Sequence, residues 1–131
     1  METYHLRTQR EKFYDITPQV EDALRKSGVR DGLCLVYCPH TTAGLMINEN
    51  ADPDVMKDLL LALDRISPDR PEFRHREGNS AAHMKAALLG SSVTLPVEDG
   101  KLALGMWQGV YFCEFDGPRT RSFHVKLLGS R

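Results

Sequence analysis

The sequence has few of the features that direct a chain to a membrane, to a secreted disulfide framework or to a polyanion. Its longest apolar run, residues 33–38, is too short to cross a bilayer. The start of the chain has no signal-like segment, and the three cysteines form no Cys-x-x-Cys pair. The 17 basic and 18 acidic residues give a net charge of −1, which attracts neither nucleic acid nor an anionic membrane. These absences predict a cytoplasmic protein without nucleic-acid or membrane partners.

The length and composition predict one globular domain. Hydrophobic residues make up 41% of the 131 positions, and charged residues make up 27%. A chain of this size is too short for a (β/α)₈ barrel, which needs at least about 200 residues. There is also no repeat, low-complexity tract or linker-like stretch. We therefore treat residues 1–131 as a single domain.

Apolar periodicity and turn residues predict about three helices and several short strands. The first helix begins at Thr17-Pro18 and ends at Gly28, the second runs from the Asp52 cap to a point before Pro68, and the third runs from the Asn79 cap to Gly90. The predicted strands lie at about residues 4–8, 33–38, 45–47, 93–97, 102–104, 106–115 and 120–128, and an Asp99-Gly100 turn pairs Val97 with Leu102 and Leu95 with Leu104. The pattern favours an α+β fold with a mixed, largely antiparallel sheet.

Three of the five histidines are candidate metal ligands. His40 lies at a strand end, His75 lies in the long polar loop, and His83 lies on the third predicted helix. Neutral imidazole is a common zinc ligand, and three protein ligands with one open position are usual in catalytic zinc sites. Because no standard spacing such as His-Glu-x-x-His is present, surface or capping roles stay open. His5 and His124 lie on alternating strands beside Arg or Lys, so we expect them to be solvated.

Acidic residues supply candidate general acids and bases. The set comprises Glu49, Asp52, Asp54, Glu77, Glu114 and Asp116. Glu114 alternates with Val110 and Phe112, so we expect its carboxylate to point into an apolar face, where it needs a partner. Two interpretations remain open: a structural ion pair with Arg119 or Arg121, or an acid or base with a displaced pKa.

The turn at residues 77–80 leads directly into the third predicted helix. Free backbone amides and the helix dipole at such a terminus favour an anion such as phosphate. Arg76, Lys85 and Arg119 would add positive charge nearby. The alternative is a turn that only caps the helix.

Several long motifs occur together, in order, and resemble the YjbQ-like family. They are HTTAG at 40–44, NENADPDV at 48–55, HREGNSAAH at 75–83, WQG at 107–109 and EFDGPR at 114–119. The resemblance covers essentially the whole chain. One departure is Phe73, which stands where we would expect tyrosine.

The resemblance implies a homotrimer of α+β subunits with a polar cleft near the subunit boundary. It implies a divalent metal held by His40, His75 and His83, zinc in the first instance or magnesium with a diphosphate substrate. The other cleft residues it implies are Glu49, Asp52 and Glu77, which we assign to catalysis, and Asn79, Ser80, Trp107, Gln108 and Arg119, which we assign to substrate binding.

The family is also described as secondary thiamine-phosphate synthase, which implies a transferase. The implied reaction joins hydroxymethylpyrimidine diphosphate to thiazole phosphate and releases pyrophosphate. Arg119 and the helix terminus at Asn79 are the candidate phosphate contacts, and Trp107 is a candidate for stacking on a flat ring. Two alternatives stay open: a metal-dependent hydrolase of another small phosphorylated or ester substrate, with Glu49 or Glu77 as base, and a non-catalytic trimer that binds a metal or metabolite.

Overall fold

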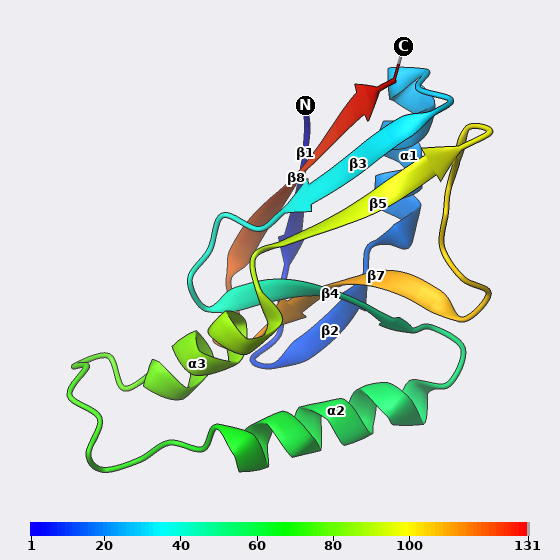
Figure 1. Cartoon of the computed structure of the whole chain (residues 1–131). Coiled ribbons are helices and arrows are strands. Elements are labelled where there is room, and N and C mark those ends of the chain that lie inside the picture. The colour runs from blue at the N-terminus through cyan, green and yellow to red at the C-terminus, as the bar shows by residue number, and fades with distance from the viewer. Residues whose placement is uncertain (131) are drawn as a thin grey trace.

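Two antiparallel sheets and three helices make up the fold in the computed structural model, which describes residues 1–130 (Figure 1). The helices are α1 (Thr17–Ser27), α2 (Pro53–Ile66) and α3 (Ser80–Leu89). The strands are β1 (Glu2–Arg7), β2 (Lys12–Asp15), β3 (Gly32–Tyr37), β4 (Ala43–Glu49), β5 (Ser92–Glu98), β6 (Lys101–Leu102), β7 (Gln108–Glu114) and β8 (Thr120–Gly129). The predicted α+β class is confirmed, although the strands form two sheets rather than one.

The strand orders are β1-β8-β3-β5-β6 in the larger sheet and β2-β7-β4 in the smaller one. The predicted Asp99-Gly100 turn joins β5 to β6 and pairs Val97 with Leu102, as expected. The predicted pairing of Leu95 with Leu104 is wrong, because β6 ends at Leu102 and the chain then turns toward β7. Strand β2 was not predicted, since its four residues are too few to show a clear alternation.

The helix ends follow the predicted stop residues, but two of the three predicted caps differ. Gly28 ends α1 with a φ of +70°, and the Asp52 carboxylate accepts the Asp54 N–H over 2.9 Å, as predicted. Thr17 is not a cap: it is the first residue of α1, and its hydroxyl accepts the Val110 N–H over 2.9 Å. The Asn79 side chain makes no capping hydrogen bond either, because its amide binds Asp116 instead.

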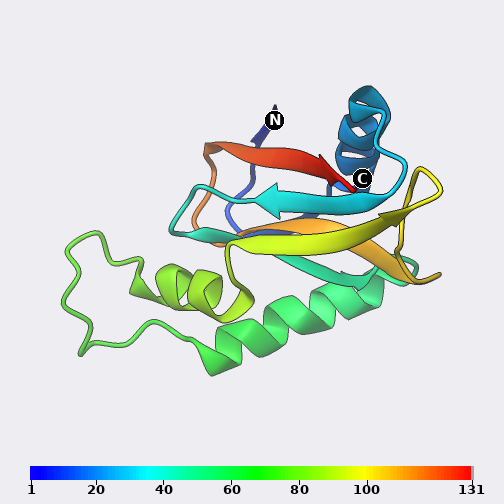
Figure 2. The same ribbon diagram turned by 45° about the horizontal axis from the view of Figure 1, so that its top comes forward.

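Figure 2 shows the layers of sheet and helix, and two hydrophobic clusters hold them together. The first lies between the two sheets and α1 and includes Val110 and Phe112. The second lies on the other face of the smaller sheet, where α2 and α3 pack, and includes Tyr111 and Cys113. Successive β7 residues therefore serve opposite clusters, which explains why this strand is apolar on both faces.

Strand β3 is central, as its apolar run predicted, yet only one of its faces is buried. Cys34 and Val36 are fully buried, whereas Leu33, Leu35 and Tyr37 are 48%, 39% and 44% exposed. Leu128 of β8, which pairs with Leu33 of β3, is also exposed. We call Leu33, Leu35, Tyr37 and Leu128 the outer-sheet patch.

Helix α2 is attached by a half-buried apolar stripe and by a lysine with two carboxylate partners. None of its residues is fully buried, although Met56, Leu59, Leu60 and Leu63 pack against the second cluster. The Lys85 ammonium on α3 binds Asp64 of α2 and, over 2.7 Å, Glu11. Burial alone would lower the pKa of Lys85, but the two carboxylates outweigh it and raise that pKa. The Lys85 ammonium therefore binds these two carboxylates and is not available to bind an anion.

Candidate functional site

The three predicted metal ligands line one open cavity of about 370 Å³. His40 reaches it from the segment after β3, which ends at Tyr37, and His83 reaches it from α3. His75 comes from the loop between α2 and α3. The His75 and His83 ring centroids lie 5.5 Å apart, with the ring planes at 87°. Segments far apart in the sequence thus place three imidazoles around one space, which we call the histidine cavity.

The backbone of β8 fixes the His40 ring. Its Nε2 lies 3.0 Å from both the carbonyl oxygen and the amide nitrogen of Ser122. Its Nδ1 has no hydrogen-bond partner within residues 1–130 and keeps a lone pair when the proton is on Nε2. Burial, and then the nearby charge of Arg121, lower the pKa of His40 and favour the neutral form that can bind a metal.

A buried ion pair supports this end of the cavity. Glu114 is 0% exposed, and its Oε1 and Oε2 accept hydrogen bonds from Arg121 Nε and Nη2 over 2.7 and 2.5 Å. Arg121 Nη2 also donates to the Thr42 hydroxyl over 2.8 Å. Burial alone would raise the pKa of Glu114, but the bonds from Arg121, Thr8 and the Asp116 N–H lower it. Of the two interpretations, the structural ion pair is the one that forms, with Arg121 rather than Arg119.

Asp116 connects two predicted substrate-binding residues. Its Oδ2 accepts one hydrogen bond from Asn79 Nδ2 over 2.7 Å and another from Arg119 Nη2 over 2.9 Å. Its carbonyl oxygen also accepts Arg119 Nε over 2.8 Å. The Asn79 amide is therefore turned toward Asp116, which explains why it does not cap α3. Asn79 and Arg119 both line the histidine cavity, and Ser80, the first residue of α3, lies beside Asn79 without lining it.

The donor chemistry of the cavity suits a divalent metal, but the donors do not form a ready-made site. Among residues 1–130, no three His, Cys, Asp or Glu side chains are grouped closely enough to hold an ion. His75 Nε2 lies 3.9 Å from Glu77 Oε1, and both side chains are largely exposed on their loop. Three imidazoles and a carboxylate are the donor types that zinc and related metals prefer. A three-histidine site would therefore require side-chain or loop movement, and His75 is the most exposed of the three imidazoles.

The remaining predicted site residues lie elsewhere in the chain. Glu49 ends β4 and pairs with Gln108, which begins β7, whereas His40 lies near the opposite ends of these strands. Seven strand residues separate the two groups by about 20 Å. Asp52 caps α2, and Trp107 is 59% exposed in the turn before β7. A single chain therefore does not bring Glu49, Asp52, Trp107 and Gln108 to the histidines.

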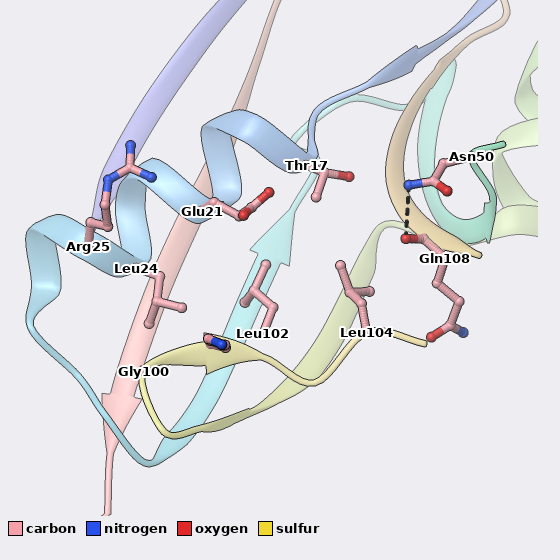
Figure 3. Close-up of a pocket in the computed structure, with 10 residues that line it drawn as sticks. Thr17, Glu21, Leu24, Arg25, Asn50, Gly100, Leu102, Leu104 and Gln108 are labelled. Carbon is pink, nitrogen blue, oxygen red and sulfur yellow. Dashed lines mark hydrogen bonds between the residues drawn. The ribbon is translucent and has the colours of Figure 1, made fainter. Parts of the chain in front are cut away.

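Of these residues, Gln108 lines a second cavity of about 420 Å³, between α1 and the β5–β6 hairpin (Figure 3). Asn50 and Gln108 stand at one end of it, and the Asn50 Nδ2 donates to the Gln108 carbonyl oxygen over 3.1 Å. Thr17 and Glu21 of α1 line it as well. No sequence signal marked Thr17 and Glu21 as site residues, because they are ordinary residues of an amphipathic helix.

The chain matches one protein-family model and several curated proteins over nearly all of its length. The model described as "UPF0047 protein YjbQ-like" matches residues 2–130. UPF0047 protein YugU of Bacillus subtilis is 55% identical over 123 residues, which are 93% of this chain and 93% of the relative. A UPF0047 protein of Archaeoglobus fulgidus is 48% identical over 122 residues, covering 92% of this chain and 94% of the relative.

Solved structures agree with this assignment. An uncharacterized conserved protein of the YjbQ/UPF0047 family from Clostridium acetobutylicum superposes with a TM-score of 0.95 at 53% identity, covering 98% of this chain and 100% of that one. A YbjQ-like protein of unknown function from Sulfolobus solfataricus gives 0.93 at 33% identity, covering 98% and 96%. None of the helices within residues 1–130 is long and apolar enough to span a membrane. By sequence and by fold, this chain belongs to the YjbQ-like UPF0047 family.

Proposed function

We propose that the protein is a transferase that acts on small phosphorylated substrates at the histidine cavity. The specific reaction we propose joins hydroxymethylpyrimidine diphosphate to thiazole phosphate, as the sequence resemblance implies. The observation that carries the proposal is the meeting of His40, His75 and His83 with Arg119 around one cavity. Imidazoles suit a divalent metal and a guanidinium suits phosphate, so the cavity offers both requirements of diphosphate departure.

The reaction needs charge stabilisation rather than redox chemistry. The bond between the pyrimidine methylene carbon and the diphosphate oxygen breaks, and its electron pair leaves with the diphosphate. The thiazole nitrogen then donates its lone pair to form the new carbon–nitrogen bond. Arg119 uses Nε and Nη2 to bind Asp116, which fixes the guanidinium and leaves Nη1 to contact the departing phosphate.

A divalent metal bound by His40, His75 and His83 would neutralise charge on the diphosphate. The Ser122 backbone orients the His40 ring, and Asp116 orients Arg119, so both groups are held before substrate binds. Glu77 lies beside His75, with Oε1 3.9 Å from Nε2, and would help to orient that imidazole toward a bound metal. Three free, buried cysteines are in keeping with a reducing, cytoplasmic setting.

A product assay tests this proposal. Purified protein with both substrates and zinc or magnesium is expected to form thiamine phosphate, detected by mass spectrometry, together with one pyrophosphate per product. Omission of thiazole phosphate is expected to stop pyrophosphate release. Folded protein that gives no product above a metal-only control would exclude the transferase.

One observation favours the hydrolase alternative. Glu77 lies beside the candidate metal ligand His75, where it could act as a base for a water molecule at the metal. In the same assay, a hydrolase would cleave the pyrimidine diphosphate without thiazole phosphate. The omission reaction therefore separates the two chemistries directly.

We propose in addition that the protein works as a homotrimer. The outer-sheet patch supports this, because a central strand with an uncovered apolar face needs a covering partner. The separation of Glu49, Asp52, Trp107 and Gln108 from the histidines supports it too. A neighbouring copy could supply these side chains to a shared cleft.

Replacing Leu35 with lysine is expected to weaken subunit association at least about tenfold, because it puts a charge at the centre of the patch. Sedimentation equilibrium should then give a mass below three times 14.8 kDa at concentrations where the parent chain is trimeric. Met84→Lys, at an exposed position on α3, is the matched control. A monomeric parent chain, or dissociation by Met84→Lys alone, would refute this interface.

A further inference from the structure

We propose that the second cavity, between α1 and the β5–β6 hairpin, is a separate binding site for a small zwitterion. It shares no lining residue with the histidine cavity. Its volume of about 420 Å³ lies in the range of small-ligand sites, roughly 300–1,000 Å³. We call it the α1 cavity. Its existence as a site does not depend on the transferase reaction, because ligand binding to it can be measured directly.

The floor of the α1 cavity is apolar and continuous with the core. Leu24 of α1 is buried at 4% exposure, and Leu102 and Leu104 pack partly buried against the first hydrophobic cluster. Figure 3 shows the three leucine side chains lying side by side below the helix. A floor of this kind accommodates a single ring or a short aliphatic body.

Two opposite charges line the same cavity from different elements. Glu21 on α1 points into it (Figure 3), and Lys101 lines it from the hairpin. Neither forms an ion pair with any residue in the range 1–130, so they are more than 4 Å apart. Arg25, also in the lining, turns away and binds Asp22 over 3.4 Å. A ligand with an ammonium group for Glu21 and an acid group for Lys101 would satisfy both charges.

The polar end of the cavity is held rigidly. The Gln108 Oε1 accepts the Gly105 N–H over 2.8 Å, and the Asn50 N–H donates to the Trp107 carbonyl oxygen over 2.9 Å. Gly109 leaves no room for a side chain, since a Cβ there would lie 2.9 Å from the Asn50 Cβ and 3.2 Å from the Thr17 hydroxyl. Asn50 and Gln108, which belong to the motifs at 48–55 and 107–109 and do not line the histidine cavity of the same chain, therefore form a fixed wall of the α1 cavity.

Three related probes test the site by two-dimensional NMR of the full chain. They are 4-(aminomethyl)benzoate, which carries both charges, benzylamine, which carries only the positive one, and benzoate, which carries only the negative one. The zwitterion is expected to bind most tightly, with shifts at residues 21–25, 100–104 and 108. Glu21→Gln should weaken the binding of benzylamine and of the zwitterion about tenfold but leave benzoate binding unchanged. Lys101→Gln should instead weaken benzoate binding and leave benzylamine binding unchanged.

Glu98→Gln and Lys126→Gln, both at exposed strand positions, are the matched controls and should bind like the parent chain. His40→Ala should also leave probe binding unchanged, so failure of the transferase and failure of this site are distinguishable. No shifts at millimolar probe, shifts confined to the histidine cavity, or binding of all three probes by Glu21→Gln and Lys101→Gln as tight as by the parent chain would each overturn the proposal.

Discussion

Replacing Arg121 with methionine is expected to lower the free energy of unfolding by about 3–5 kcal/mol. The variant leaves the fully buried Glu114 carboxylate without its main partner, and only Thr8 and the Asp116 N–H remain to bind it. An uncompensated buried charge costs more than the lost attraction itself. Urea unfolding at pH 7, followed by circular dichroism, measures the change.

Two control variants separate this effect from the loss of an arginine in general. Arg119→Met removes a half-exposed partner of Asp116 and should cost no more than about 1 kcal/mol. Glu114→Leu combined with Arg121→Met removes both charges and should be more stable than Arg121→Met alone. If Arg121→Met and Arg119→Met were equally stable, the buried pair would not have the role assigned here.

The pH dependence of stability gives the ion pair a second signature. The folded-state pKa of Glu114 is lowered, so its stabilisation is fully present above the ordinary glutamate pKa, about 4.3. That stabilisation is lost as the pH falls through the folded-state pKa. In Arg121→Met the carboxyl can protonate more readily, so the stability gap to the parent chain should narrow in acid.

Much of the fold could be predicted because local signals agree with the final packing. Gly28 and the Asp52-Pro53 pair end and begin helices for reasons contained in their own side chains. The division into two sheets could not be predicted, since it depends on which strands meet. Strand β7 looks like any apolar run, and only the structure assigns Phe112 to one cluster and Cys113 to the other.

The histidines of the cavity could be predicted from the sequence in part, but the residues that hold the cavity in place, Arg121 and Asp116, could not. Residue type and polar context identified His40, His75 and His83 as candidates, but spacing alone could not bring them together. From sequence alone Arg121 is a candidate partner for Glu114 and not a cavity residue, although its alternation with Phe123 and Val125 on β8 places it on the buried face. The role of Asp116 depends on long-range contact with Asn79, for which the sequence holds no signal.

Replacing His83 with alanine is expected to lower both metal content and thiamine phosphate formation about 100-fold, and His40→Ala should do the same. Each removes one of the three imidazoles that surround the histidine cavity, and a two-histidine remnant binds a divalent metal weakly. Elemental analysis of purified protein measures the first quantity, and the product assay measures the second.

His124→Ala is the matched control, because His124 lies on the outer face of β8, where it stacks on Tyr37 rather than lining the cavity.

The His75 and His40 variants are expected to differ in stability. His75 is the exposed member of the three and lies on a loop, so His75→Ala should lose metal while its stability to urea stays near that of the parent chain. His40→Ala should lose some stability as well, since the His40 ring bonds to the β8 backbone. Unchanged metal content in all three variants would show that the cavity binds no metal through these side chains. Phosphate would then have to be stabilised by Arg119 without a metal.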